Sequence, residues 1–168
     1  NMLSNFSEAQ SLADVFISSR NLTKYYLHKV KDADKKKRFS IGEWNTNSIH
    51  WIVSHLAWAE NYLILDAVIG RKETVPWFQY FEIGSPYPEE SKFPSYEEAV
   101  NTLDWIHEKS IAEIRNLSNQ QLDEKNFAGI DFRDGDSKRK IIHHAIRHEG
   151  THCGHLSWLA KLHGLKGR

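Results

Sequence analysis

Two histidines near the carboxyl end of the chain have the spacing of a metal-binding pair. His148 and His152 are four residues apart in a segment whose apolar residues recur at helical spacing. Residues at i and i+4 lie on one face of a helix, so their imidazoles can meet a single metal ion. At about 100° per residue, both fall within the inward-facing stripe of this helix, which also contains Ile141, Ala145, Leu156 and Leu159.

Two imidazoles in an apolar stripe are costly unless something satisfies them. An unpaired buried polar group costs about 1–3 kcal/mol, and protonation of neighbouring rings adds repulsion. A shared divalent cation removes both costs, because neutral imidazole is a good ligand for Zn, Ni, Cu or Fe. Hydrogen bonds to a neighbouring carboxylate are the alternative, and the pair alone favours neither.

A third histidine, His55, can complete such a site from a different helix. It shares a helix face with Ile52, Ala59 and Tyr62, whereas His50 falls on nearly the opposite side. Considered alone, His55 would be an ordinary core histidine, and it gains weight only in combination with the later pair. Three imidazoles leave at least one coordination position open, as in catalytic rather than structural zinc sites.

Four long segments are predicted to be the helices that position these residues. The first covers residues 6–31, with Ser7 and Gln10 as its capping box. The second runs from a cap at residues 46–48 to residue 69, where Gly70 ends it. The third starts at the capping box of Ser95 and Glu98, and the fourth runs from a Ser137 cap to about residue 164. The apolar stripe of the first helix is expected to contain Leu12, Val15, Phe16, Leu22, Tyr25, Tyr26 and Val30.

Four amphipathic helices predict an all-α four-helix bundle. Residues 71–94 form a long connection rich in aromatic residues between the second and third helices, and a connection of this length is usually functional or part of the packing. Ser118 is expected to cap a further short turn, and residues 127–139 a loop with a small hairpin at Asp134 and Gly135. We expect residues 2–168 to form one domain, with Asn1 a leftover of an expression tag.

The composition narrows the function classes. Lys plus Arg and Asp plus Glu are both 22, so charge gives no reason to expect nucleic acid or an anionic membrane as a partner. No apolar run is long enough to span a bilayer. Cys153 is the only cysteine, and together with the missing signal peptide it favours a cytoplasmic protein. The chain has no phosphate loop, nucleophile elbow or kinase signature.

With His55 in the second helix and His148-x-x-x-His152 in the last, the chain resembles the DinB/YfiT-like superfamily of metal-binding four-helix bundles. The resemblance extends over essentially the whole chain in helix order and spacing. The last motif often reads His-x-x-x-His-Arg-Gly-Gln in that family. Here Gly154 is kept, while Cys153 and His155 replace the usual Arg and Gln, so only the three ligands are carried over.

The resemblance implies a metal-dependent hydrolase or a thiol-dependent S-transferase, and a homodimer. The expected cofactor is a divalent transition metal, Zn or Ni. It would lower the pKa of a bound water to about 7 or deprotonate a low-molecular-weight thiol. The expected partners are therefore a small-molecule substrate and a second copy of the chain, with no nucleic acid and no membrane.

The sequence also suggests roles for residues around the three histidines. Glu149 is expected on the helix surface or beside a ligand, and Glu60, or else a backbone carbonyl, to support a ligand ring. Cys153 is assigned to packing rather than chemistry, and no general base is identified. An aromatic group either lines a pocket beside the metal or packs in the core or a dimer interface; it comprises Trp51, Trp58, Tyr62, Trp77, Phe78 and Tyr80.

Two functions therefore remain open. The preferred one is an enzyme, a metal-dependent transferase or hydrolase acting on a small molecule. The alternative is a non-catalytic dimeric binding or stress-response module in which the metal tethers two helices. Chelation separates them, because removing a structural ion should lower the melting temperature far more than removing a catalytic one.

Overall fold

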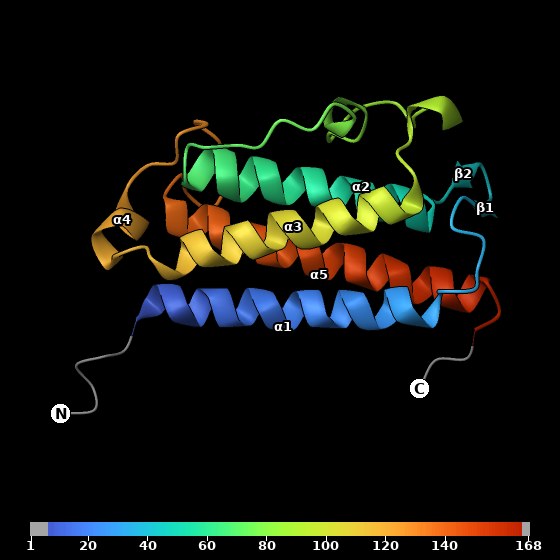
Figure 1. Ribbon diagram of the computed structural model, residues 1–168, viewed down its shortest axis with the longest axis horizontal. Coiled ribbons are helices and arrows are strands. Elements are labelled where there is room, and N and C mark those ends of the chain that lie inside the picture. The colour runs from blue at the N-terminus through green and yellow to red at the C-terminus, as the bar shows by residue number, and fades with distance from the viewer. Residues whose placement is uncertain (1–6, 166–168) are drawn as a thin grey trace.

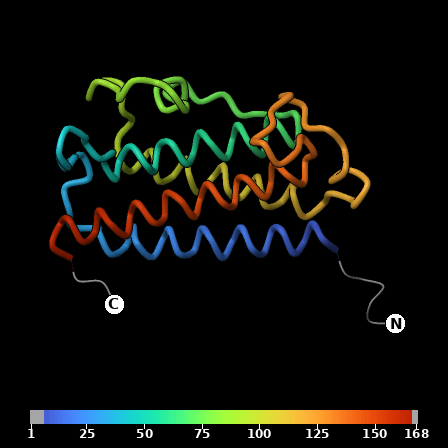
Figure 2. Tube along the Cα trace, turned by 180° about the vertical axis from the view of Figure 1, so that it is seen from behind, coloured from blue at the N-terminus to red at the C-terminus, as the bar shows by residue number. Residues whose placement is uncertain are grey.

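Four long helices packed side by side form the body of the protein (Figures 1 and 2). They are α1 (Glu8–Lys29), α2 (Ile49–Glu60) with its continuation η2 (Asn61–Val68), α3 (Tyr96–Arg115) and α5 (Lys138–Leu162). In this computed structural model, which describes residues 7–165, α1 packs along α5 and α2 packs along α3. The predicted all-α bundle is confirmed. Residues 2–6 and 166–168 of the predicted domain, and the predicted helix start at residue 6, lie outside the described residues.

Serine side chains begin the helices at the positions predicted from the sequence. Ser7, Ser48, Ser95 and Ser137 each accept a hydrogen bond from the backbone N–H three residues further on. Ser118 begins the short helix α4 (Asn119–Asp123) with the full capping box expected of a serine and a glutamine at this spacing. Each cap satisfies a helix N–H that has no partner within the helix.

The second long helix changes type halfway along. It is α-helical up to Glu60 and π-helical over η2 (Asn61–Val68), and it ends before Gly70, whose φ is +80°. The Asn61 amide binds both backbone groups of Glu73, with Nδ2 donating to the carbonyl at 3.1 Å and Oδ1 accepting from N–H at 2.8 Å. These two hydrogen bonds hold the start of the 71–94 connection against the first residue of the π-helical stretch.

The predicted apolar face of α1 is only partly correct. Val15, Leu22 and Tyr25 were expected in the core, but they are 48%, 52% and 49% exposed. The face that packs inward instead contains Arg20 and Thr23, with Ala9, Ala13, Phe16 and Leu27. Two of the buried residues are polar, so the spacing of apolar residues in the sequence pointed to an adjacent face of the helix instead of the face that is buried.

The structure confirms one predicted feature of the connections between helices and corrects another. Residues 71–94 contain the 3-10 turns η3 (Phe78–Tyr80) and η4 (Glu90–Lys92), and Trp77, Phe78 and Phe81 enter the core as packing residues. The hairpin expected at Asp134 is wrong, since the described chain has there only an isolated bridge between Lys125 and Ser137. A small hairpin forms instead from β1 (Ser40–Ile41) and β2 (Trp44–Asn45), turning at a glycine with φ of +62°.

Within residues 7–165, no helix combines the length and the apolar character needed to cross a membrane.

Candidate metal centre

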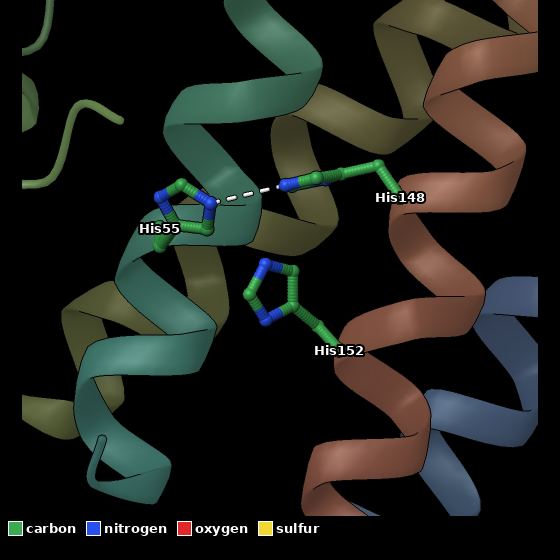
Figure 3. Close-up of side chains that lie close together, drawn as sticks. All are labelled: His55, His148 and His152. Atoms are coloured by element: carbon green, nitrogen blue, oxygen red, sulfur yellow. Dashed lines mark hydrogen bonds between the residues drawn. The ribbon is translucent and has the colours of Figure 1, made fainter. Parts of the chain in front are cut away.

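Three imidazoles meet between α2 and α5 (Figure 3). His55 comes from α2, and His148 and His152 come from successive turns of α5. One ring nitrogen from each lies within 4.8 Å of the other two, and the Nε2 atoms of His55 and His148 are 3.1 Å apart. Two nitrogens bound to one tetrahedral zinc at about 2.05 Å are about 3.3 Å apart. The three histidines singled out from the sequence are therefore brought together at a spacing that fits a metal ion.

Neighbouring groups orient two of these rings. His55 Nδ1 is 2.7 Å from the Phe81 carbonyl, to which it donates, so its Nε2 presents a lone pair toward the cluster. The support is thus a backbone carbonyl, one of the two partners expected. His152 Nδ1 is 3.2 Å from Nδ1 of His155 on the next turn. Trp51 stacks on the His55 ring at 4.4 Å between centroids and so restrains it from the side.

Burial keeps the cluster uncharged. Burial, together with repulsion from the neighbouring histidines, lowers the pKa of His148 to about 3 and that of His152 to about 2. The pKa of His55 is lowered for the same principal reason. Neutral imidazole is the form that binds metal, and a cation shared by all three would satisfy the nitrogens that burial has desolvated. The donor set therefore fits a divalent transition metal.

A buried ionic network beside the cluster was not foreseen. Arg20 donates to Glu149 Oε1 at 2.8 and 2.5 Å and to Glu60 Oε2 at 2.8 Å, and the three side chains are almost fully buried. Thr23 donates to the other Glu149 oxygen at 2.8 Å, and His107 Nδ1 is 2.6 Å from Glu60. No local sequence pattern signals this network, because its members come from four different helices.

This network corrects two assignments. Glu149 is not on the helix surface, because it is 1% exposed, and its carboxylate accepts hydrogen bonds from Arg20 and Thr23 of α1 rather than from a histidine of the cluster. Glu60 supports His107 and Arg20, so it does not support His55. Both carboxylates are therefore committed to holding helices together.

Three other residues that could have taken part in the site lie outside the histidine cluster. Cys153 is buried, and burial raises the pKa of its thiol, which agrees with packing rather than chemistry. His50 packs between Phe93 and Tyr96, away from the cluster as expected. His144 stacks on an aromatic ring of the 124–137 loop and lies 6.1 Å from His148 between ring centroids.

The aromatic group is also divided. Trp51 and Trp58 lie against His55, at 4.4 and 5.4 Å between ring centroids, and Tyr62 stacks on Trp58. Trp77 and Phe78 are buried in the core, and Tyr80 packs against it. Trp51 and Trp58 thus flank the histidine cluster, Tyr62 lies behind Trp58, and the other three support the fold.

One comparison with known proteins finds a match, and it is to a protein family. No curated protein and no solved structure matches the chain. The family model described as the DinB superfamily matches residues 9–156, which include nearly all of α1, the whole of α2, η2 and α3, α5 as far as Leu156, and all three clustered histidines. The chain therefore belongs to the DinB superfamily.

Proposed function

We propose that this protein binds one divalent transition-metal ion, Zn or Ni, through His55, His148 and His152. The observation that carries the proposal is the convergence of three neutral imidazoles from two helices, with 3.1 Å between two of their Nε2 atoms. Ring nitrogens facing one another at this distance need either a proton or a cation between them. The low pKa values of about 3 for His148 and about 2 for His152 keep both rings neutral, the form that binds metal. A neutral ring can donate one N–H to one neighbour, whereas a cation can bind all three rings at once.

We propose further that the protein is an enzyme that acts on a small molecule, as a thiol S-transferase or a hydrolase. Three ligands leave a coordination position for a substrate or water. When bound, the ion would supply Lewis acidity, lowering the pKa of a thiol or of water to near neutrality. Glu60 and Glu149 are paired with Arg20, so neither is free to close that position. Trp51 and Trp58 flank His55 and limit access of solvent to one side of the cluster.

The protein is also proposed to act as a homodimer, as the family resemblance implies. Large exposed apolar side chains support an interface, foremost Trp44, which is 81% exposed. Light scattering of the purified protein at several concentrations tests this, and a monomer throughout would contradict it.

The ligand assignment is tested by elemental analysis of untagged protein loaded with zinc and then desalted. We expect about one zinc per chain in the unaltered protein and almost none in His148→Ala. His144→Ala is the matched control, because it removes an imidazole one turn away on the same helix that is outside the cluster. Equal zinc content in the two variants would refute the assignment.

Activity is tested on the same three proteins with a thiol-transfer screen and an esterase screen. A reaction that requires zinc and disappears in His148→Ala, but not in His144→Ala, supports an enzyme. If chelation lowers the melting temperature strongly and neither screen gives a metal-dependent reaction, the ion tethers α2 to α5 and the catalytic proposal is wrong.

A further inference from the structure

A cavity of about 430 Å³ opens at the end of the bundle that carries the β1–β2 hairpin. It lies between the first turn of α2, the last turns of α5 and the residues of the hairpin. Its apolar lining consists of Ile41, Ile52, Trp158, Leu159 and Leu162. The volume falls within the range of roughly 300–1,000 Å³ that is typical of small-molecule sites.

The cavity lies next to the histidine cluster, and one residue, His155, belongs to the surroundings of both. His155 lines it and also contacts the cluster, since its Nδ1 is 3.2 Å from Nδ1 of His152. On the opposite side Ile52 lines it, one helical turn before His55. The three-residue step from Ile52 to His55 rises about 4.5 Å along the helix axis, a distance that a tail of a few bonds spans.

The lining indicates what the cavity accepts. Apart from His155, its polar residues are the uncharged side chains of residues 45–47, and among residues 7–165 no Asp, Glu, Lys or Arg lines it. A second cavity, of about 460 Å³ and bordered by Trp58, differs sharply in this respect, because Asp66, Lys72 and Glu73 line it. A charged group would lose its hydration in the first cavity without gaining an ionic partner, whereas an apolar group would gain from burial.

We propose that this first cavity is a substrate subsite that holds an uncharged, apolar group of the small molecule, whose polar reacting group lies at the histidine cluster. This inference rests on the proposed function, because the cluster must bind a metal to anchor the polar end. The substrate class that follows is a small metal-binding compound with an alkyl or aromatic tail, rather than one charged at both ends.

Hydroxamates of different tails test the proposal on the zinc-loaded full-length protein by titration calorimetry. Acetohydroxamate carries the metal-binding head alone, hexanohydroxamate adds four methylenes, and 6-aminohexanohydroxamate places a charge at the tail end. Burial of one methylene strengthens binding roughly fourfold. We therefore expect the hexanoyl compound to bind at least about tenfold more tightly than acetohydroxamate, and the amino compound to lose this advantage.

Two variants locate the tail. Trp158→Ala removes a 66% exposed side chain from the rim of the proposed subsite, and Ile83→Ala removes an exposed apolar side chain from the charged cavity. Neither residue belongs to the histidine cluster, so both variants should keep their zinc. We expect the tail advantage to fall at least about threefold in Trp158→Ala and to be unchanged in Ile83→Ala.

The outcomes separate this inference from the proposed function. Equal affinity for the acetyl and hexanoyl compounds, with one zinc bound, would overturn the subsite and leave the metal site standing. Loss of the tail advantage in Ile83→Ala alone would move the tail to the charged cavity and equally overturn the proposal. A dimer that dissociates in Trp158→Ala would assign this surface to a second copy of the chain, again against the subsite. Absence of zinc from the unaltered protein would overturn both proposals.

Discussion

Replacing the buried Arg20 by methionine should destabilise the protein far more than any surface ion pair could. Arg20 donates to two carboxylates and to the Leu103 carbonyl, so it joins α1 to α2, α3 and α5. Without its charge, Glu60 and Glu149 remain as carboxylates in a dry interior, each about 2% exposed at the side chain. Removing one partner of a buried pair typically costs about 3–5 kcal/mol.

The loss of stability in Arg20→Met is limited by the hydrogen bonds that the two carboxylates retain. Glu60 retains His107 at 2.6 Å, and Glu149 retains the Thr23 hydroxyl at 2.8 Å. Neither replaces the shared guanidinium, so we expect a loss of about 3–4 kcal/mol from the free energy of unfolding. This is a large part of the 5–15 kcal/mol by which proteins are usually stable.

Urea unfolding at pH 7, followed by circular dichroism, measures the effect. With a slope of about 2 kcal/mol per molar urea, the midpoint should fall by about 1.5–2 M. Lys24→Met is the matched control on the same helix, because Lys24 pairs with Asp104 at 2.8 Å but both side chains are substantially exposed. That change should cost less than about 1 kcal/mol.

A background variant identifies the cause of the loss. In Glu149→Gln one of the two stranded charges is already absent, so adding Arg20→Met should cost clearly less there than in the unaltered protein. If Arg20→Met costs no more than Lys24→Met, or the same in both backgrounds, the network does not hold the helices together as described.

Three further changes have defined outcomes. In the metal-free protein, the free energy of unfolding should fall as the pH drops below about 6.5. Burial holds the pKa of His148 near 3 and that of His152 near 2, so the unfolded chain takes up protons first, at up to about 1.4 kcal/mol per pH unit for each group; urea midpoints that stay constant from pH 7.5 to 5 would be inconsistent with this. His155→Ala should weaken zinc binding at least about tenfold in a chelator competition, because His155 helps to position the His152 ring. His155→Gln should largely retain zinc binding, since its amide oxygen can accept a hydrogen bond from His152. Equal affinities of the alanine variant and the unaltered protein would exclude this positioning role. Gly70→Ala should cost more than about 1 kcal/mol in urea unfolding, because φ is +80° and the added Cβ would lie 3.0 Å from an aromatic ring, while Gly154→Ala in an open helical position should stabilise; the reverse order would contradict the structure.

Features that depend on neighbours in the sequence were predictable. Ser48 and Ser137 begin their helices because a side-chain oxygen and an N–H three residues away decide the cap. Helical spacing likewise placed His148 and His152 on one face of α5, and the same argument separated His55 from the residue on the opposite side. These statements need no knowledge of what packs against each helix.

Features that depend on distant partners were not predictable in the same way. Arg20 is on the inward face of α1 because Glu149, 129 positions away, neutralises it there, and no local pattern encodes that pairing. Asn61, at the start of the π-helical stretch, likewise binds the backbone of Glu73, twelve positions further along the chain. The orientation of His55 requires the Phe81 carbonyl, which belongs to a long connection with no regular pattern of its own.

The central claim is that three histidines from α2 and α5 bind one metal ion. Anomalous diffraction at the zinc edge, from crystals of zinc-loaded protein, tests it most directly. We expect a single strong peak per chain with one ring nitrogen each of His55, His148 and His152 at about 2.0–2.1 Å. A map with no peak among these three rings, or a peak bound only by other side chains, would contradict it.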